Sequence, residues 1–354
     1  MMKSLLRKLA PEFLISAYHY LWAISGALFY GFPAKKMIVI GITGTKGKTT
    51  AANFIWSCLT AAGHKTGLMG TANIRIGEEE KLNEYHMTMP GRFILQRTLR
   101  QMVDSGCKYC VMEVTSEGIK QKRHKGIAFD VAVFTNLYPE HLPSHGGSFE
   151  KYKKAKGQLF KALSRSRKPQ KISVLNFDSP HKDYFASFKS DKQITFGYKE
   201  GADFRAENII NTQEGVEFSV GGARHELGML GDFNVINALC AVAVCSSLGI
   251  EKEVIKSGLK NLAVVPGRME KIDAGQNFTV IVDYAHEKRS MTLLVSSAQK
   301  MRKSPSSRII VLLGAEGGGR DKAKRPAMGK IVGQKADFVI VSNVDPYEDD
   351  PKEI

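Results

Sequence analysis

A glycine- and lysine-rich segment follows the first strongly apolar run of the chain and carries the clearest chemistry in the sequence. The run KMIVI ends at Ile40, and the next ten residues, 41–50, read GITGTKGKTT. A glycine-rich turn between a buried strand and a helix directs backbone N–H groups and the helix N-terminus at an anion. We therefore expect a phosphate-binding loop in which Lys48 neutralises the β- and γ-phosphates of a nucleotide and the Thr49 hydroxyl binds Mg²⁺.

This loop departs from the strict G-x-x-x-x-G-K-[ST] pattern at one position. Ile42 stands where the first glycine belongs, whereas Gly44, Gly47, Lys48 and Thr49 are in place. The alternative is a glycine turn that binds no phosphate, but the strand before it and the helix predicted after it favour a phosphate loop.

Composition limits the classes of partner. The chain has 354 residues, enough for two domains with separate cores, and its 43% apolar and 24% charged residues are typical of globular proteins. A net charge of +16 favours anionic partners. Because no basic block is interleaved with aromatic residues, we expect phosphorylated small molecules and no nucleic acid.

The cysteines predict a reducing environment rather than a redox or metal site. There are five, an odd number, and Cys107 and Cys110 form a C-x-x-C without a second pair at zinc spacing. Cys110 belongs to the strand-like run YCVMEV. Buried structural thiols are therefore the preferred interpretation.

An uncharged segment near the N-terminus leaves three interpretations open. Residues 13–32 contain no Asp, Glu, Lys or Arg and are flanked by basic residues on both sides. Twenty such residues could just span a bilayer, but His19, three tyrosines, two serines and two glycines weaken that interpretation. A helix that lies on the inner face of a membrane, or on the protein itself, is equally consistent.

The order of the elements predicts an α/β fold. After residue 36, apolar strand-like runs alternate with helical patterns, which favours a parallel sheet with ligands at the carboxyl ends of its strands. Residues 195–230 are glycine-punctuated and predict a small antiparallel patch. The segment VVPGRME, residues 264–270, predicts a hinge at Pro266–Gly267. The expected organisation is a helical segment over 1–36, a nucleotide-binding domain over 37–263 and a second, incomplete α/β domain over 264–354.

The form TGTKGKTT, together with six later segments in the same order, resembles the ATP-dependent Mur ligases, and the tripeptide synthetases among them most closely. The resemblance covers residue 37 to the end of the chain. The segments after the loop are MEVTSEG, FTNLYPEHLPSHGG, YKKAKGQLF, GDFNVINA, VPGRME with VIVDYAH, and GGGRDKAKRP. It implies a central P-loop ATPase domain with a parallel sheet, followed by a smaller Rossmann-like α/β domain.

The resemblance also implies a site. Two Mg²⁺ ions would be held by Thr49, Glu113, His141 and a carbamate formed on Lys156. Glu140 replaces the aspartate that precedes the histidine in the family. The catalytic residues would be Lys48, Lys156, His141 and Lys324. ATP would contact the loop residues Gly44, Thr45, Lys46, Gly47, Lys48, Thr49 and Thr50, and also Asn234, Arg268 and Asp283. Asn237 is a further candidate for an ATP contact. The substrates would contact Thr88, Thr115, Ser116, Arg123 and Arg320.

The implied reaction joins a carboxylate to an amine. The carboxylate belongs to a UDP-sugar-peptide precursor of peptidoglycan. The γ-phosphoryl group of ATP converts it to an acyl phosphate, and the amine of an amino acid then attacks the acyl phosphate. A monomer in the cytoplasm is expected. Only about 36 residues precede the first strand, and Asp345-Pro346-Tyr347 stands where the family has Asn-Pro-Arg, so neither the acceptor nor the amino acid is assigned.

Three other functions remain open. The ligase could act on another acid, such as a polyglutamate or a cyanophycin-like substrate. The chain could be a P-loop ATPase or phosphotransferase without ligation. It could also be a non-catalytic scaffold anchored through residues 13–32.

Overall fold

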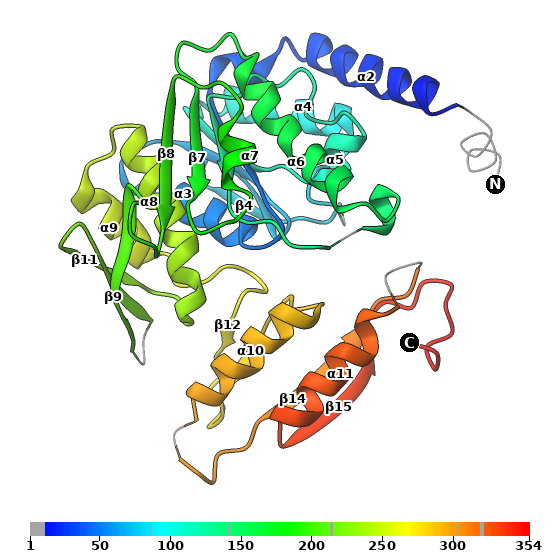
Figure 1. Cartoon of the computed structure of the whole chain (residues 1–354), viewed down its shortest axis with the longest axis vertical. Coiled ribbons are helices and arrows are strands. Elements are labelled where there is room, and N and C mark those ends of the chain that lie inside the picture. The colour runs from blue at the N-terminus through cyan, green and yellow to red at the C-terminus, as the bar shows by residue number, and fades with distance from the viewer. Residues whose placement is uncertain (1–10, 86, 141, 213–214, 303, 319–321) are drawn as a thin grey trace. The chain divides into compact units, whose positions relative to one another are not determined.

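The chain divides into two compact units that meet within the predicted linker. The computed structural model describes residues 11–354 except 86, 141, 213–214, 303 and 319–321. Unit 1 comprises residues 1–266 and unit 2 residues 267–354, so the division falls between Pro266 and Gly267 (Figure 1).

Unit 1 is built on one large sheet. Among the described residues it has eleven strands in the order β11-β10-β9-β8-β7-β6-β1-β5-β2-β3-β4. The bounds of the strands are β1 Ile38–Thr43, β2 Thr66–Met69, β3 Asn73–Ile76, β4 Glu79–Leu82, β5 Tyr109–Glu113, β6 Val131–Phe134, β7 Ile172–Asn176, β8 Lys192–Gly197, β9 Phe204–Asn211, β10 Val216–Val220 and β11 Ala223–Leu227.

The centre of the sheet is parallel and its two edges are antiparallel. Strands β2, β5, β1, β6, β7, β8 and β9 pair in parallel, while β3 and β4 at one edge and β10 and β11 at the other pair antiparallel. This arrangement confirms the α/β class. The antiparallel patch expected over 195–230 is narrower than predicted, because residues 195–197 belong to β8, which continues the parallel centre.

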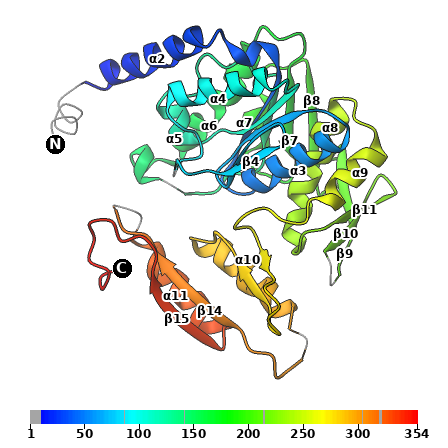
Figure 2. The ribbon, with the colours of Figure 1, turned by 180° about the vertical axis from the view of Figure 1, so that it is seen from behind.

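Helices cover both faces of the sheet, and each face has its own core. One core contains residues of α3 Lys48–Ala61, α8 Val235–Ser247 and α9 Lys252–Asn261. The other contains residues of α4 Arg92–Asp104, α5 Ser116–Lys120, α6 Phe149–Ser164 and α7 Lys182–Ala186. Figure 1 shows α6 and α7 in front of the sheet, and Figure 2 shows α3 in front from the other side. Parallel strands buried on both faces are typical of this architecture. Short 3₁₀ turns, η2 Pro143–His145 and η3 Asp232–Asn234, precede α6 and α8.

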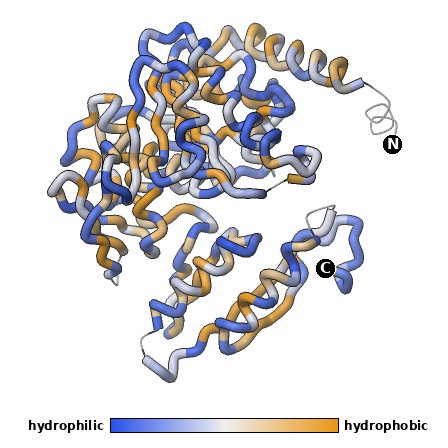
Figure 3. The backbone as a smooth tube through the Cα atoms, in the orientation of Figure 1, coloured by the Kyte–Doolittle hydropathy of each residue, from blue (hydrophilic) through white to orange (hydrophobic). Residues whose placement is uncertain are grey.

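Helix α2, Glu12–Phe29, contains most of the uncharged N-terminal segment and packs on the protein itself. It contacts α4, with Ala23 and Ala27 fully buried, and the 3₁₀ turn η1 Pro33–Lys36 then leads into β1. The helix is rich in hydrophobic residues (Figure 3), and several of its large apolar side chains are exposed; Trp22 and Phe29 are 47% and 76% exposed. No helix within the described residues combines the length and the apolarity that crossing a membrane requires.

The cysteines are free thiols inside unit 1, as predicted. Cys107 and Cys110 are buried at β5, and Cys58, Cys240 and Cys245 are buried in α3 and α8.

Unit 2 has two small sheets and two helices among its described residues. Strands β12 Glu270–Ile272 and β13 Val280–Val282 pair antiparallel, and β14 Ile310–Ala315 and β15 Phe338–Asn343 pair in parallel. Helices α10 Lys288–Lys300 and α11 Lys324–Lys335 pack on each other and share a small core with β14.

Candidate active site

The phosphate loop connects β1 to α3 and depends on two glycines. Gly44 has φ +156° and Gly47 has φ +80°. A Cβ atom on Gly44 would lie 1.9 Å from Thr135 Oγ1, and one on Gly47 would lie 2.2 Å from Asn237 Oδ1. The loop can therefore keep this path only with glycine at both positions.

The residues that follow β6 hold the loop in place. Asn136 Oδ1 accepts a hydrogen bond from the Lys46 N–H at 2.8 Å, and its backbone carbonyl accepts one from the Thr45 N–H at 2.9 Å. Thr135 Oγ1 donates to the Lys46 carbonyl at 2.7 Å. The Lys46 ammonium also pairs with Glu140 Oε1 at 3.0 Å. The loop is therefore held by the residues that follow the neighbouring strand, and the N–H groups of Thr45 and Lys46 are both bonded to Asn136.

Two lysines converge on one carbonyl of the loop. Lys48 Nζ donates to Gly44 O at 3.0 Å and to Thr45 O at 3.1 Å. Lys156 Nζ, from α6, donates to the same Gly44 O at 2.6 Å. The Lys156 side chain is 2% exposed and its ammonium position lies over the Tyr152 ring. Burial, and then the charge of Lys48, lower the pKa of Lys156 well below its ordinary value, although Glu140 opposes this shift.

Glu113 lies at the end of β5, directly beside the strand that carries the loop. It pairs with Ile42 of β1 in register and is buried. The Thr71 N–H donates to Glu113 Oε1 at 2.6 Å, and the Thr71 hydroxyl lies 3.1 Å from Oε2. Thr71 Oγ1 also lies 2.9 Å from Thr88 Oγ1. The structure thus brings the predicted metal ligand Glu113 and the predicted substrate contact Thr88 together through Thr71.

The two candidate asparagines lie at the start of α8. Asn234 precedes the first residue of the helix but its side chain does not cap it; Nδ2 donates to the Leu230 carbonyl at 2.8 Å instead. Asn234 Oδ1 accepts from Asn237 Nδ2 at 3.3 Å, and the Asn237 amide oxygen faces Gly47. This pair therefore reaches the phosphate loop through Asn237.

The other loop threonines are buried in the first turn of α3. Thr49 is 4% and Thr50 is 5% exposed, and the Thr49 carbonyl accepts a hydrogen bond from Asn53. The Thr45 hydroxyl lies 3.1 Å from the Tyr152 hydroxyl, on the same helix that supplies Lys156.

The predicted acceptor contacts divide into two groups. Arg123 donates to the carbonyl of Met89, next to Thr88, and to Gln121 Oε1, so these two segments do lie together. Thr115 instead caps α5, accepting a hydrogen bond from the Gly118 N–H at 3.1 Å, and Ser116 is 4% exposed. Thr115 therefore has a structural role here.

Two predicted residues lie outside the described part of the chain, His141 and Arg320. Within the described part, no three His, Cys, Asp or Glu side chains gather as a metal-binding cluster. The ligand set implied by the resemblance draws on a threonine and a modified lysine, which such a cluster would not include.

The candidate residues of unit 2 lie around its first strands and at α11. Met269 N–H donates to Asp283 Oδ2 at 2.8 Å, and the Arg268 guanidinium lies 4.9 Å from the centre of the Tyr284 ring. Lys324 is the first residue of α11. Arg268 and Asp283 are therefore neighbours within unit 2.

Sequence reasoning missed the residues that position the others. Thr71, Thr135, Asn136 and Tyr152 all contact predicted site residues. The last three lie within the quoted segments FTNLYPEHLPSHGG and YKKAKGQLF but were assigned no role there. A polar Thr-Asn pair directly after the apolar run VAVF was the available signal for Thr135 and Asn136. Thr71 had no comparable signal.

Comparisons with known proteins show which family the chain is similar to. The family model described as Mur ligase middle domain matches residues 42–245, and the model described as Mur ligase, glutamate ligase domain, matches residues 267–354. The UDP-N-acetylmuramoyl-L-alanyl-D-glutamate--2,6-diaminopimelate ligase of Geobacillus kaustophilus (strain HTA426) is 40% identical over 351 residues, which cover 97% of this chain and 70% of that protein. The UDP-N-acetylmuramyl-tripeptide synthetase of Roseiflexus sp. (strain RS-1) is 40% identical over 338 residues, covering 92% and 65%.

The fold comparison gives the same result. A solved structure of a UDP-N-acetylmuramoyl-L-alanyl-D-glutamate--2,6-diaminopimelate ligase is 27% identical with a TM-score of 0.67, covering 90% of this chain and 64% of that one. The chain thus spans about two thirds of the length of the curated relatives that it matches. The resemblance carried by the seven segments is confirmed. The chain belongs to the Mur ligase family of ATP-dependent enzymes that form amide bonds, and it contains the middle and glutamate-ligase domains of that family.

Proposed function

We propose that this chain joins an amino acid to the carboxylate of a UDP-MurNAc-peptide type of acceptor, with ATP as the source of the phosphoryl group. The observation that carries the proposal is the convergence of Lys48 and the buried Lys156 on the Gly44 carbonyl, beside a strand that ends in Glu113. Such an arrangement serves a reaction in which two anions, a polyphosphate and a carboxylate, must approach each other.

Mg²⁺ fits the donors that the residues offer. Mg²⁺ prefers hard oxygen ligands. Glu113 is a buried carboxylate in which each oxygen accepts one hydrogen bond from Thr71, so each retains capacity for a further ligand. Thr49, at the start of α3, supplies a hydroxyl. We assign Glu113 and Thr49, with His141 and a modified Lys156, to two Mg²⁺ ions, which would offset the charge of the phosphates when bound.

Lys156 fits carbamylation because its amine is suited to react with CO₂. Only an uncharged amine has the lone pair that attacks the carbon of CO₂, and the environment lowers the pKa of Lys156. Formation of the N–C bond releases one proton and leaves an anionic carbamate. The product places a negative charge beside Lys48, so the two side chains attract each other.

The chain's own residues would then organise the reaction. The backbone N–H groups of Gly47–Thr50 would bind the phosphates of ATP, because those of Thr45 and Lys46 are bonded to Asn136. Lys48 would shift from Gly44 O to the transferring γ-phosphoryl group. The acceptor carboxylate attacks phosphorus, ADP leaves, and the amine attacks the resulting acyl phosphate so that inorganic phosphate departs. Thr88 and Arg123, which the structure links through neighbouring backbone, would orient the acceptor peptide.

Several assignments rest on the resemblance alone. These are the nucleotide contacts Asn234, Arg268 and Asp283, and the roles of Lys324, Arg320, Thr115 and Ser116. The same holds for a monomeric state and a cytoplasmic location. The domain limits 1–36, 37–263 and 264–354 are proposed from the order of the elements and the break at Pro266–Gly267. Contact of residues 13–32 with the inner membrane face is proposed from the exposed apolar side of α2.

Substrate-dependent phosphate release tests the proposal. The protein is incubated with ATP, Mg²⁺ and bicarbonate, and UDP-MurNAc-dipeptide is combined with lysine, diaminopimelate or other amines in turn. We expect release of phosphate only when both an acid and an amine are present, with the ligated product detected by mass spectrometry. Phosphate release that needs neither substrate would identify an ATPase instead, and turnover with a different acid would redirect the assignment to that acid.

A further inference from the structure

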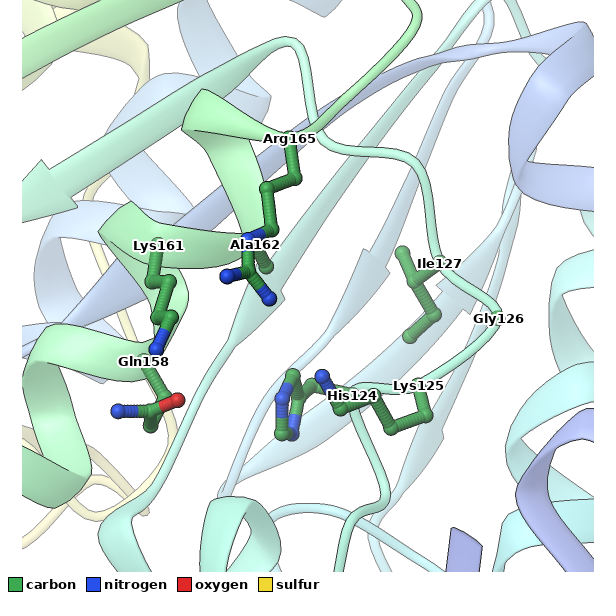
Figure 4. A pocket seen from close by; sticks show the side chains of 8 residues that line it. All are labelled: His124, Lys125, Gly126, Ile127, Gln158, Lys161, Ala162 and Arg165. Atoms are coloured by element: carbon green, nitrogen blue, oxygen red, sulfur yellow. The ribbon is translucent and has the colours of Figure 1, made fainter. Parts of the chain in front are cut away.

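A basic pocket lies on the opposite face of helix α6 from Lys156. It has a volume of about 160 Å³ and is lined by the loop of residues 124–127 and by Gln158, Lys161, Ala162 and Arg165 of α6 (Figure 4). These four α6 positions follow the i, i+3, i+4, i+7 spacing of one helix face, and at about 100° per residue that face points away from Lys156. The pocket is therefore separate from the phosphate loop.

Three cations surround this pocket without an acidic partner. Lys125, Lys161 and Arg165 line it, and the charges of Arg165 and Lys161, together with Lys122, contribute to lowering the pKa of Lys125, after burial as the largest cause. In the part of the chain that the structure describes, no carboxylate forms an ion pair with any of the three lining cations. Like charges gathered in this way are stabilised by an anion placed between them.

A buried histidine in the same wall has unused hydrogen-bonding capacity. His124 is 3% exposed and lines the pocket, yet neither Nδ1 nor Nε2 has a hydrogen-bond partner. Burial, followed by the charges of Lys125 and Lys122, lowers the pKa of His124 to about 3, so the ring is neutral at pH 7. A neutral imidazole offers one N–H donor and one acceptor nitrogen. Leaving both unsatisfied is costly in a buried site, and a ligand in the pocket would satisfy one of them.

The loop that carries His124 is fixed against the N-terminal helix. Gly126 has φ +79°, and a Cβ atom there would lie 2.5 Å from the Cβ of Ala27 in α2. The pocket wall is therefore formed before any ligand arrives, and it adjoins the helix whose outer side is apolar and exposed.

We propose that this pocket is a binding site for a phosphate group, distinct from the nucleotide site. Three cations exceed what one singly charged carboxylate requires, whereas a phosphate dianion carries more charge and more acceptor oxygens for Lys125, Lys161, Arg165 and the His124 N–H. The volume also exceeds the roughly 10–15 Å³ that a single water needs. The group belongs either to a soluble phosphate compound or to the headgroup of an acidic phospholipid, since α2 adjoins the pocket.

The His124 ring resonances give a site-specific test that phosphate binding at the phosphate loop does not disturb. The ring nitrogens of ¹⁵N-labelled full-length protein are observed by NMR while inorganic phosphate is added at low ionic strength, with the His124→Gln variant used to assign the signals. We expect saturable shifts of the His124 nitrogens. The double variant K161Q/R165Q should weaken binding at least about tenfold, because each charge-assisted hydrogen bond contributes strongly. The matched control K154Q/R167Q removes two charges from α6 and the residues just after it, outside the pocket, and should change the affinity less than about twofold.

A second arm identifies the source of the phosphate. Co-sedimentation with vesicles of phosphatidic acid in phosphatidylcholine is compared between the wild type and the same two double variants. Vesicle binding that K161Q/R165Q removes and K154Q/R167Q retains assigns the group to a lipid, whereas saturation by inorganic phosphate alone assigns it to a soluble compound. Either result supports the site. Unmoved His124 signals together with equal vesicle binding by all variants would overturn it, and so would an equal effect of the two double variants in both arms.

Discussion

Replacing Lys156 by methionine tests whether its amine is uncharged before any reaction with CO₂. The donor–acceptor distances to Gly44 O, 2.6 Å for Lys156 and 3.0 Å for Lys48, place the two nitrogens no more than 5.6 Å apart. At an effective dielectric constant of about 20, two ammonium groups at that separation repel by at least about 3 kcal/mol. Loss of the Lys156 proton removes this repulsion and also the cost of burying a second charge.

The substitution should therefore separate stability from activity. Lys156→Met loses one hydrogen bond, which contributes about 1 kcal/mol, but Gly44 O keeps its bond from Lys48. It also removes a lysine whose pKa folding lowers, and with it the cost of burying an ammonium group beside Lys48. We expect the variant to be at least as stable as the wild type at pH 7, while ligation falls by about 100-fold or more because the proposed ligand for the Mg²⁺ ions is lost.

The lowered pKa of Lys156 predicts how the stability of the wild type changes with pH. Because the pKa of Lys156 is lower in the folded state than its ordinary 10.5, the unfolded chain holds a proton that the native chain lacks between those two values. The stability contributed by the wild-type lysine therefore rises with pH up to that ordinary value and falls as the pH decreases. Relative to Lys156→Met, the free energy of unfolding of the wild type should rise with pH from 7 to 9, by at most about 1.4 kcal/mol for each pH unit.

Urea unfolding in CO₂-depleted buffer at pH 7, 8 and 9 measures this difference. Both tryptophans, Trp22 and Trp56, lie in unit 1, so their fluorescence follows the unit that contains Lys156. The control is Lys154→Met, an exposed lysine on the same helix, for which no such trend is expected. A stability difference between wild type and Lys156→Met that stays constant from pH 7 to 9 would refute a neutral Lys156.

Three further substitutions test the supports of the site. Gly47→Ala should weaken ATP binding at least about tenfold, because the new methyl group would overlap Asn237 Oδ1 as well as strain the backbone. Thr71→Val should raise the Mg²⁺ concentration needed for half-maximal ligation by about tenfold, since Glu113 loses a hydrogen bond to one oxygen. Thr115→Ala should lower the free energy of unfolding by about 1 kcal/mol through loss of the α5 cap, measured by urea unfolding.

Matched control substitutions distinguish these specific effects from a general loss of folded protein. Gly63 has a similar φ of +76°, but no atom lies within 4 Å of the position that an added methyl group would take, so Gly63→Ala should leave ATP affinity unchanged. Exposed Thr60 provides Thr60→Val and Thr60→Ala as controls for the two threonines. Equal ATP affinities for Gly47→Ala and Gly63→Ala, an unchanged Mg²⁺ requirement in Thr71→Val, or wild-type stability in Thr115→Ala would each contradict the corresponding assignment.

Local patterns were sufficient to predict the central fold and the loop. A β-branched run, a glycine turn and a helix start are consecutive in the chain, so β1, the phosphate loop and α3 could be predicted without tertiary information. Helix α6 could also be predicted from the sequence, because its apolar spacing is regular and Ser148 caps it.

The hydrogen bonds that hold the loop and Glu113 in place could not be predicted from local patterns. The bond from the Lys46 N–H to Asn136 spans 90 positions, and that from Thr71 to Glu113 spans 42. The first depends on β1 lying beside β6 and the second on β2 lying beside β5, neighbours that no local pattern specifies. Helix α2 shows the same limit. Its uncharged composition suits a membrane or a protein surface equally, and only its packing, with Ala27 against Gly126, shows that one side is buried on the protein.

The most direct measurement of the central claim follows oxygen from the acceptor to phosphate. When the acceptor carboxylate carries ¹⁸O, attack on the γ-phosphorus makes one labelled oxygen the bridge of the acyl phosphate, and departure of phosphate after attack by the amine carries that oxygen away. We predict one ¹⁸O in the inorganic phosphate for each amide bond formed, and none without the acceptor. Amide formation that leaves the phosphate unlabelled, or phosphate whose new oxygen comes from water, would contradict activation of the carboxylate by phosphorylation.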